Sequence, residues 1–289
     1  MVRNMKFWFV TGSQPLYGEE PLRQVEENSR VIVNGLKLPF PVEYKQTVKN
    51  ASQIETLIKE ANYDEECAGI ITFCHTFSPS KMWINGLALL QKPWLHFHTQ
   101  FNASIPNDEI DMDYMNLHQS AHGDREHGFI GARLRMPRAV IAGHWQDPAV
   151  QEKIALWQRA AVGAMFSHSL KIVRFGDNMR EVAVTEGDKI EAQLRMGWQV
   201  NTWAVGDLVA EMNQVTEAEI DQLMKEYAAL YDFDAADTET IRYQAREEIA
   251  MERILVAVGA KAFTNTFEDL HGMRQLPGLA AQDLMRQGY

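Results

Sequence analysis

Three short polar loops, each directly after an apolar run, carry side chains suited to ligand binding or proton transfer. They are Gly12–Gly18, His75–Ser78 and His96–Gln100. Apolar runs such as Ala68–Phe73 are consistent with buried strands. In an open α/β sheet, ligands bind outside the carboxyl ends of the strands. We therefore expect the first half of the chain to bring these loops together at one edge of a sheet.

His96 and His98 are separated by a single residue in the third loop. On a strand, this spacing places both imidazoles on the same face, where they could form part of a metal site. Two histidines are only half of such a site, because a structural zinc ion is bound by four ligands. The alternative is that both rings are hydrogen-bonded histidines of the core or of a loop.

An amide and an imidazole lie three residues apart at Gln119 and His122. On a helix, the two side chains share a face and could hydrogen-bond the hydroxyl groups of a polyol. In a loop, the spacing carries no such information. The following residues, Gly123-Asp124-Arg125, favour a turn.

Two later segments combine both charges or several acidic groups at predicted strand ends, Arg174–Glu181 and Phe267–Gly272. The first suits either an active-site loop or a solvated turn joined by salt bridges. In the second, Glu268, Asp269 and His271 suggest acid–base chemistry, although adjacent carboxylates usually face different ways. Five tryptophans near the loops could stack on a sugar or belong to the core: Trp83, Trp94, Trp145, Trp198 and Trp203.

The elements that position these loops read as strands alternating with helices, which is typical of a parallel, doubly wound sheet. Strands are predicted over Phe7–Val10, Val42–Val48, Cys67–Phe73, Pro93–Phe97 and Arg138–Ala142. Helices are predicted over Leu22–Leu36, after a capping box formed by Ser52 and Glu55, over Met82–Leu90, and after the N-cap and first-turn pair Asp147-Pro148. Between them, Phe101–Arg135 has no regular pattern.

A domain boundary is expected near the polar residues that precede Lys171. Residues 1–169 then form an N-terminal α/β domain, and residues 170–289 form a central α/β domain. Strands of the second domain are predicted over Lys171–Phe175, Val182–Val184, Trp198–Val200 and Ala262–Phe267. Helices are predicted over Val205–Met212, after a capping box of Thr216 and Glu219, over Glu239–Val258 ending at Gly259, and over Gln282–Gln287.

Composition indicates a globular protein that does not bind nucleic acid or an anionic membrane. The 289 residues carry a net charge of −11 with a pI near 5.3, and no basic block reverses this balance locally. No apolar run approaches the roughly 20 residues of a membrane span, and none near the start is long enough for a signal peptide. Cys67 and Cys74 read as buried thiols in a reducing cytosol, and nucleotide-binding motifs are absent.

Seven segments that span nearly the whole chain resemble L-arabinose isomerases, in the order in which that family carries them. They are Trp8–Gly18, His75–Leu87, Phe97–Asn102, Phe129–Arg133, Arg174–Thr185, Asn201–Leu208 and Thr266–Gly278. The resemblance implies two doubly wound α/β domains of the Rossmann or flavodoxin kind, with the second incomplete and the family's C-terminal β-rich domain absent. It also implies a cytoplasmic protein that forms homotrimers, paired into hexamers, with sites between subunits.

The activity implied by the resemblance is aldose–ketose isomerisation. L-arabinose is converted to L-ribulose, and D-galactose to D-tagatose, through an enediol formed with the help of Mn²⁺ or a related divalent ion. The family's two acid–base glutamates and its metal-binding histidines are expected beyond Tyr289. The resemblance thus gives this chain no catalytic or metal-binding residue, and it assigns no metal role to His96 or His98.

Residues expected to contact the sugar are transferred from the family's motifs to matching positions of this sequence. They are Gln14, Leu16, Phe77, Gln119, His122, Met179 and Phe267. In the family, the groups that match Gln119 and His122 reach the site at the junction between subunits. We expect the 289-residue chain alone to be inactive. The alternative is a non-catalytic sugar-binding or assembly module.

Overall fold

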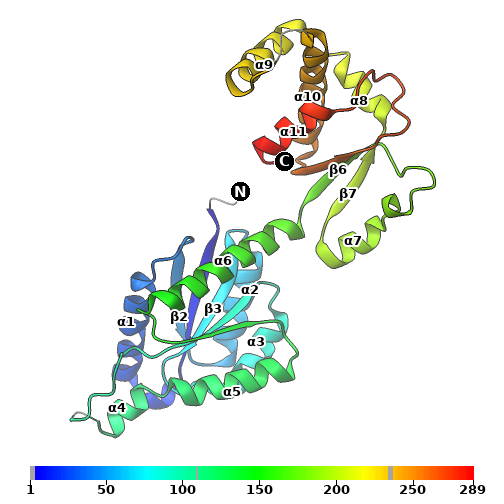
Figure 1. The fold of residues 1–289 in the computed structure, drawn as a ribbon. Coiled ribbons are helices and arrows are strands. Elements are labelled where there is room, and N and C mark those ends of the chain that lie inside the picture. The colour runs from blue at the N-terminus through cyan, green and yellow to red at the C-terminus, as the bar shows by residue number, and fades with distance from the viewer. Residues whose placement is uncertain (1–3, 109, 234–236) are drawn as a thin grey trace. The chain divides into compact units, whose positions relative to one another are not determined.

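The structure is a computed structural model that describes residues 4–108, 110–233 and 237–289 (Figure 1). It divides into two compact units, Met1–Met165 and Phe166–Tyr289, and each is described by itself. The division falls within the last turn of α6 (Pro148–His168), a few residues before the boundary that the sequence suggests. In the described part of the chain, no helix has the length and apolar character needed to cross a bilayer.

The first unit contains a parallel five-stranded sheet with the strand order β2-β1-β3-β4-β5. Its strands are β1 (Lys6–Gly12), β2 (Val42–Val48), β3 (Cys67–Cys74), β4 (Trp94–His98) and β5 (Ala139–Ala142). All five lie where the apolar runs predict them, so the expected doubly wound α/β fold is confirmed. In this flavodoxin-like order the chain changes direction between β1 and β3, and ligands bind at such a point.

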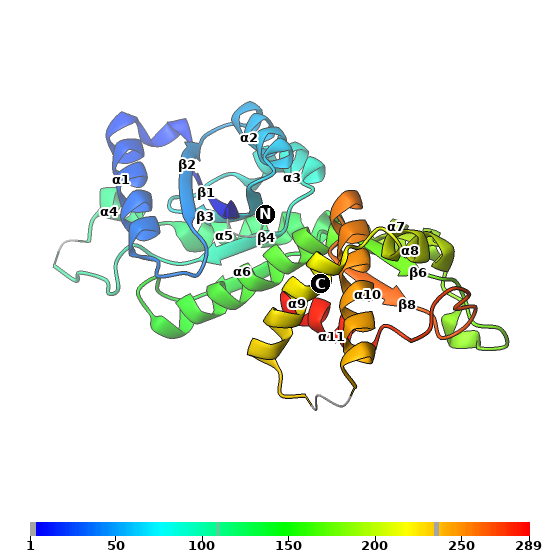
Figure 2. The ribbon, with the colours of Figure 1, turned by 90° about the horizontal axis from the view of Figure 1, so that it is seen from above.

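Alternation along β1 divides the core of this unit between the two faces of the sheet. Phe7 and Phe9 contact the cluster covered by α1 (Glu19–Gly35) and α6. Trp8 and Val10 face the other cluster, which is covered by α2 (Ala51–Tyr63), α3 (Ile84–Leu89) and α5 (Ser120–Arg133). Figure 2 shows α2 and α3 on the side of the sheet opposite α6. Burial on both faces explains why β3 is buried throughout and mostly apolar rather than alternating.

The capping box predicted at Ser52 is wrong. The N-cap of α2 is Asn50, whose side chain accepts a hydrogen bond from the backbone N–H of Gln53. Glu55 instead forms an ion pair with Lys59 one turn later. An Asn N-cap is as favourable as Ser, so the chain uses the cap that comes first.

The helix predicted over Met82–Leu90 is shorter than expected, because a 3₁₀ turn, η3 (Ser80–Trp83), precedes α3. The segment Phe101–Arg135, predicted as irregular, contains α4 (Met112–Leu117) and the 14-residue helix α5. Gly123 is helical and not part of a turn. A Cβ there would lie 2.9 Å from Cys74 Cβ, so glycine allows α5 to approach β3 closely.

The second unit contains a parallel three-stranded sheet with the order β7-β6-β8. Its strands are β6 (Lys171–Phe175), β7 (Gln199–Trp203) and β8 (Ala262–Asn265). Four helices lie at the predicted places along the chain: α8 (Val205–Met212), α9 (Glu217–Leu230), α10 (Thr238–Val258) and α11 (Gly278–Gln287). Their apolar faces build one core with Val173 and Phe175 of β6.

Local signals in the second unit are mostly confirmed. Thr216 and Glu219 form the predicted capping box, and α10 ends at Gly259 in the left-handed conformation. The strand predicted over Val182–Val184 is wrong, because a 3₁₀ turn, η4 (Ala183–Thr185), occupies these positions. An additional helix, α7 (Lys189–Met196), was not predicted.

Candidate functional site

The loops after β1 and β3 are joined at the point where the sheet changes direction. Ser13 Oγ and Thr76 Oγ1 lie 2.8 Å apart in a buried hydrogen bond. This bond connects the residues next to Gln14 and Phe77, both of which are half-buried. The structure therefore brings two predicted sugar-contacting residues onto neighbouring loops.

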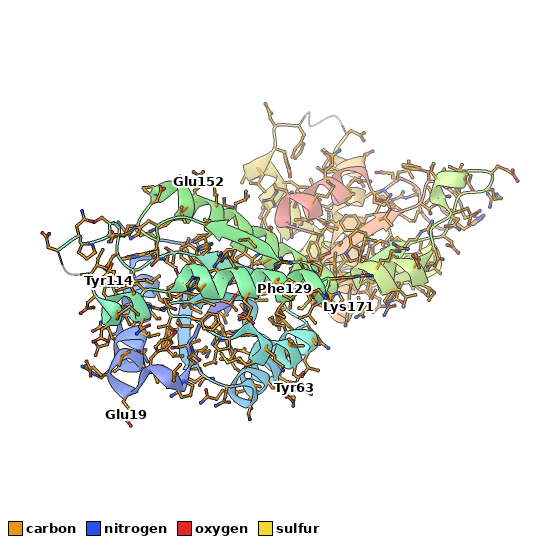
Figure 3. The ribbon with its side chains drawn as sticks, turned by 90° about the horizontal axis from the view of Figure 1, so that it is seen from below. Glu19, Tyr63, Tyr114, Phe129, Glu152 and Lys171 are labelled. Carbon is orange, nitrogen blue, oxygen red and sulfur yellow. The ribbon has the colours of Figure 1, made fainter. Side chains whose placement is uncertain are left out.

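Gln119 lies at the corner between α4 and α5, and His122 lies in the first turn of α5. Both side chains line a cleft of about 560 Å³. Leu16, 82% exposed, lines a separate cleft of about 670 Å³ against α4. Tyr114, labelled in Figure 3, lines both clefts. The α4–α5 corner thus separates two hollows that lie beside predicted sugar-contacting groups.

His75 is fully buried and connects α1 to the end of α4. Asn28 Nδ2 donates to His75 Nε2 over 3.0 Å, so the proton of His75 lies on Nδ1, which donates to the carbonyl oxygen of Leu117 over 2.9 Å. Asn28 is itself oriented by a 2.9 Å bond from Gln24. Burial lowers the pKa of His75 to about 4.

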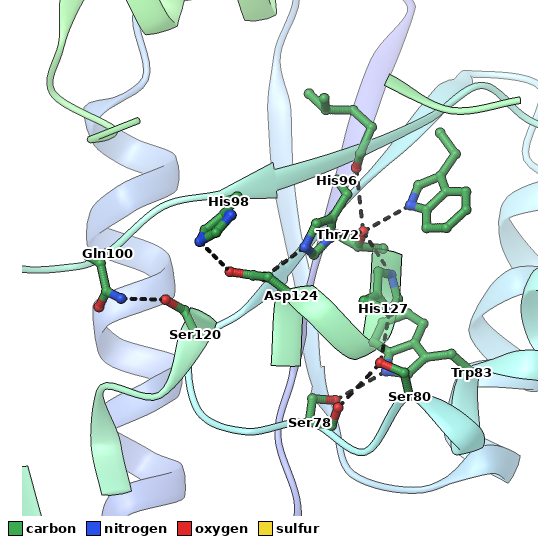
Figure 4. A network of polar contacts seen from close by, with 12 residues as sticks. Thr72, Ser78, Ser80, Trp83, His96, His98, Gln100, Ser120, Asp124 and His127 are labelled. Atoms are coloured by element: carbon green, nitrogen blue, oxygen red, sulfur yellow. Dashed lines mark hydrogen bonds and ion pairs between the residues drawn. The ribbon is translucent and has the colours of Figure 1, made fainter. Parts of the chain in front are cut away.

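A second buried polar network lies between β3, β4 and α5 (Figure 4). Trp94 Nε1, which can only donate, bonds to Thr72 Oγ1 over 2.9 Å, and His96 Nδ1 lies 2.9 Å from the same oxygen. His96 Nε2 bonds to Asp124 Oδ1 over 2.7 Å. His98 Nε2 lies 3.0 Å from Asp124 Oδ2, which has no hydrogen-bond partner of good geometry in the described structure.

Proton directions in this network follow from the carboxylate of Asp124. Because the Asp124 carboxylate accepts from His96 Nε2, the Nδ1 of a neutral His96 accepts from the hydroxyl of Thr72, whose oxygen in turn accepts from Trp94. Burial raises the pKa of Asp124, while the bond from His96 opposes that rise. The pair predicted at His96 and His98 therefore faces one carboxylate: His96 is hydrogen-bonded to Asp124, and His98 lies within 3.0 Å of its other oxygen.

In the second unit, a cleft of about 810 Å³ lies over Ile172 and Arg174 of β6, on the face away from the core. Met179, from the loop after β6, and Phe267, from the loop after β8, both line it. Trp198 lines the same cleft, whereas Trp83, Trp94 and Trp145 are buried in the core of the first unit.

Arg180 joins the two loops that carry Met179 and Phe267. Its backbone N–H donates to Glu268 over 3.0 Å, and its guanidinium bonds to Asp269 over 2.7 Å. Both carboxylates thus face one arginine, so the segment is at once a cleft-lining loop and a salt-bridged turn. His271 is almost fully exposed and lies 3.9 Å from Asp269.

Comparison with known proteins gives the same family for both units. The family model described as the L-arabinose isomerase N-terminal domain matches residues 1–169, and that of the L-arabinose isomerase central domain matches residues 171–289. The chain belongs to the L-arabinose isomerase family. L-arabinose isomerase 1 of Bacillus licheniformis is 58% identical over 98% of this chain, and the L-arabinose isomerase of Geobacillus thermodenitrificans is 56% identical over all of it.

The chain spans 58% of the length of the Bacillus licheniformis L-arabinose isomerase and 60% of that from Geobacillus thermodenitrificans. The L-arabinose isomerase of Clostridium beijerinckii, 55% identical, is likewise covered over 60% of its length. The part of these relatives that the chain matches therefore corresponds to the family's N-terminal and central domains.

The resemblance to L-arabinose isomerases leads us to expect a divalent metal. The one close group of possible ligands in the described residues does not suit such an ion. Cys74, His96 and Asp124 form the one group of three His, Cys, Asp or Glu side chains in the described residues that is close enough to hold an ion. Burial raises the pKa of the Cys74 thiol well above its usual range, and Mn²⁺ prefers oxygen ligands. Both nitrogens of His96 are already hydrogen-bonded.

The L-arabinose isomerase motifs do not single out Asp124 and His127, which sequence reasoning missed. Ser120, Asp124 and His127 are spaced by four and three residues and form a buried polar face of α5. This spacing is a detectable signal, because buried polar groups on a helix must find partners on the element that they cover. Here the partners are Gln100, His96 and Thr72.

We predict that acid destabilises the first unit of this L-arabinose isomerase family chain partly through His75. Its pKa is about 4 when folded and near 6.5 when exposed, so protons favour the unfolded state between these values. The His75 contribution to stability is complete above pH 6.5 and falls by up to about 3 kcal/mol towards pH 4. Urea unfolding at pH 7 and pH 4.5 measures this loss.

The loss should be smaller in His75→Gln, which does not titrate, and unchanged in His271→Gln, whose wild-type ring is exposed. An equal loss in wild type and His75→Gln would show that His75 does not carry the effect.

Proposed function

We propose that the protein to which this chain belongs converts L-arabinose to L-ribulose, and also accepts D-galactose to give D-tagatose. The observation that carries the proposal is the identity of 52–58% with relatives named L-arabinose isomerase over nearly the whole chain. The two units of this chain would supply groups that bind and orient the sugar.

The clefts suit an open-chain polyol in two complementary ways. Gln119 and His122 offer an amide and an imidazole that can donate to or accept from hydroxyl groups. Met179 and Phe267 offer apolar walls for the carbon chain. Gln14, Leu16 and Phe77 would contribute further sugar contacts from the loops after β1 and β3.

We propose that Mn²⁺ or a related divalent ion assists the formation of an enediol and that its ligands lie outside these 289 residues. The Cys74, His96 and Asp124 group does not suit that ion. We further propose a cytoplasmic homo-oligomer, a trimer or hexamer, in which neighbouring subunits complete each site. This assembly would bring Gln119 and His122 beside a neighbour's sugar-binding groups.

The first test is ketose formation from L-arabinose in the presence of Mn²⁺ by the purified 289-residue chain, with its intact mass verified. We expect no turnover above the blank, because the one group of three possible ligands among the described residues, Cys74, His96 and Asp124, does not suit the ion. Adding the remaining segment of a full-length relative should restore turnover if the chain is the recognition part of an isomerase.

Two results would change this proposal. Turnover by the 289-residue chain alone would mean that the acid–base and metal groups lie within it. No turnover after the remaining segment is added, together with binding of L-arabinose to the chain, would favour the non-catalytic sugar-binding or assembly module.

A further inference from the structure

The α4–α5 corner is a short segment whose position depends on contacts with the rest of the unit. It consists of Leu117 at the end of α4, His118, and Gln119, which is the N-cap of α5. The Gln119 side chain makes no capping bond and instead donates to Asn116 over 3.1 Å. Helix α4 has six residues, too few to be stable without tertiary contacts. Groups outside the corner therefore help to set the position of Gln119.

One such group is His75, which reaches the corner from the end of β3. Its Nδ1–H bonds to the carbonyl oxygen of Leu117, a position at which a helix has no further N–H to offer. The ring is also stacked near Phe101 and lies 5.4 Å from the ring of His118. Because Asn28 fixes the other nitrogen of His75, the donor can point in only one direction.

The second group is Asp124, five residues beyond Gln119 and two beyond His122. Its carboxylate is buried and meets His96 and His98, two residues of β4 on the same face of the sheet. Gln100, just after β4, adds a 2.6 Å bond to Ser120 Oγ. These contacts attach the first two turns of α5 to the carboxyl end of β4.

We propose that His75 and Asp124 are positioning residues that together fix the α4–α5 corner, and through it the amide of Gln119 and the imidazole of His122 toward the sugar. The effect on sugar binding rests on the proposed function. The fixing of the corner by His75 and Asp124 rests on the geometry alone. His75 holds the corner from the end of β3, and Asp124, on α5, attaches it to β4. Neither side chain lines the cleft formed by Gln119 and His122.

This role predicts an effect on sugar affinity rather than on chemistry. Displacing a binding group by about 1 Å weakens a contact that exists in both the bound and the transition state, which raises KM and leaves kcat nearly unchanged. In the full-length protein we expect Asp124→Ala and His75→Leu each to raise KM for L-arabinose about tenfold, with kcat within about threefold of wild type.

Conservative variants should restore much of the affinity. Asp124→Asn keeps an acceptor for His96, and His75→Gln keeps one donor and one acceptor. A matched control is Gln158→Leu, which removes two hydrogen bonds of a buried α6 side chain to the backbone of Phe40, just before β2 and at the opposite end of the strands from the corner. Its KM should stay within about twofold of wild type.

Amide hydrogen exchange of the 289-residue chain separates this inference from the proposed function. Asp124→Ala should accelerate exchange in residues 118–124 about tenfold or more, whereas Gln158→Leu should not. If exchange accelerates but the full-length protein does not isomerise L-arabinose, the proposed function fails and the positioning geometry stands. If exchange and KM both match the control, His75 and Asp124 do not position the corner.

Discussion

Replacing Glu247 with glutamine is expected to stabilise the second unit by up to about 5 kcal/mol at pH 9 and by little near pH 5. Glu247 lies on α10 with no exposed surface, and its Oε1 has no hydrogen-bond partner in the described structure. Gln244 donates to its other oxygen over 2.7 Å. Burial raises the pKa of Glu247 to about 8, because the charged form loses its water without gaining a cation.

The pH window follows from these values. Between about pH 4.5, where an exposed glutamate ionises, and pH 8, the folded state binds more protons than the unfolded state, so stability falls as pH rises. Each tenfold change in proton affinity is worth about 1.4 kcal/mol, which places the largest loss below about 5 kcal/mol. Glutamine has the shape of the protonated side chain and should remove this loss.

Urea unfolding of wild type and Glu247→Gln at pH 5, 7 and 9 measures the difference. Glu226→Gln on α9 is the control, because Glu226 is exposed and its loss should matter little at any pH. A difference between wild type and Glu247→Gln that does not grow with pH would show that Glu247 is not buried as a neutral group.

The second large effect is expected for Gly197→Ala, which should destabilise the second unit by more than about 3 kcal/mol or prevent its folding. Gly197 ends α7 with φ of +75°. A Cβ there would lie 2.6 Å from the carbonyl carbon of His168 and closer still to its oxygen. Backbone atoms cannot rotate aside, so α7 or the end of α6 would have to move.

Gly259→Ala separates this clash from the cost of the left-handed backbone. Gly259 ends α10 with φ of +67°, and a Cβ there would meet nothing within 4 Å. It should cost only about 1–2 kcal/mol, the price of a left-handed alanine. Thermal unfolding followed by circular dichroism compares the two variants. Equal losses of stability in the two variants would mean that the backbone at His168 can move away from the added Cβ. The short distance between Gly197 and His168 would then have no energetic consequence.

The strands could be predicted because each is a short apolar run with polar or turn residues at both ends. Burial on two faces leaves little choice of residue, as in Cys67–Cys74, where all eight are buried. Helix α5 could not be predicted, because its buried face is polar and glycine-rich, with Ser120, Gly123, Asp124, His127 and Gly131. Its partners are histidine and threonine on the sheet, so the usual apolar spacing is missing.

Residue types alone did not determine what the candidate groups do. Whether His96 and His98 bind a metal or a carboxylate depends on Asp124, which comes from a helix 26 residues or more along the chain. Similarly, the opposite charges of Arg180 and Glu268 do not reveal that their loops share a cleft with Met179 and Phe267. The order of the strands in the sheet determines which side chains from distant segments become neighbours, and the loop sequences do not encode that order.

The central position of β1 sets an order for folding during synthesis. β1 pairs with both β2 and β3, yet it leaves the ribosome before either of them. Its apolar residues lack the neighbouring strand β3 until the chain has been synthesised through Cys74, about 60 residues later. Parallel pairing across such separations is slow, so the nascent chain carries an exposed hydrophobic strand that favours binding by chaperones until β3 arrives.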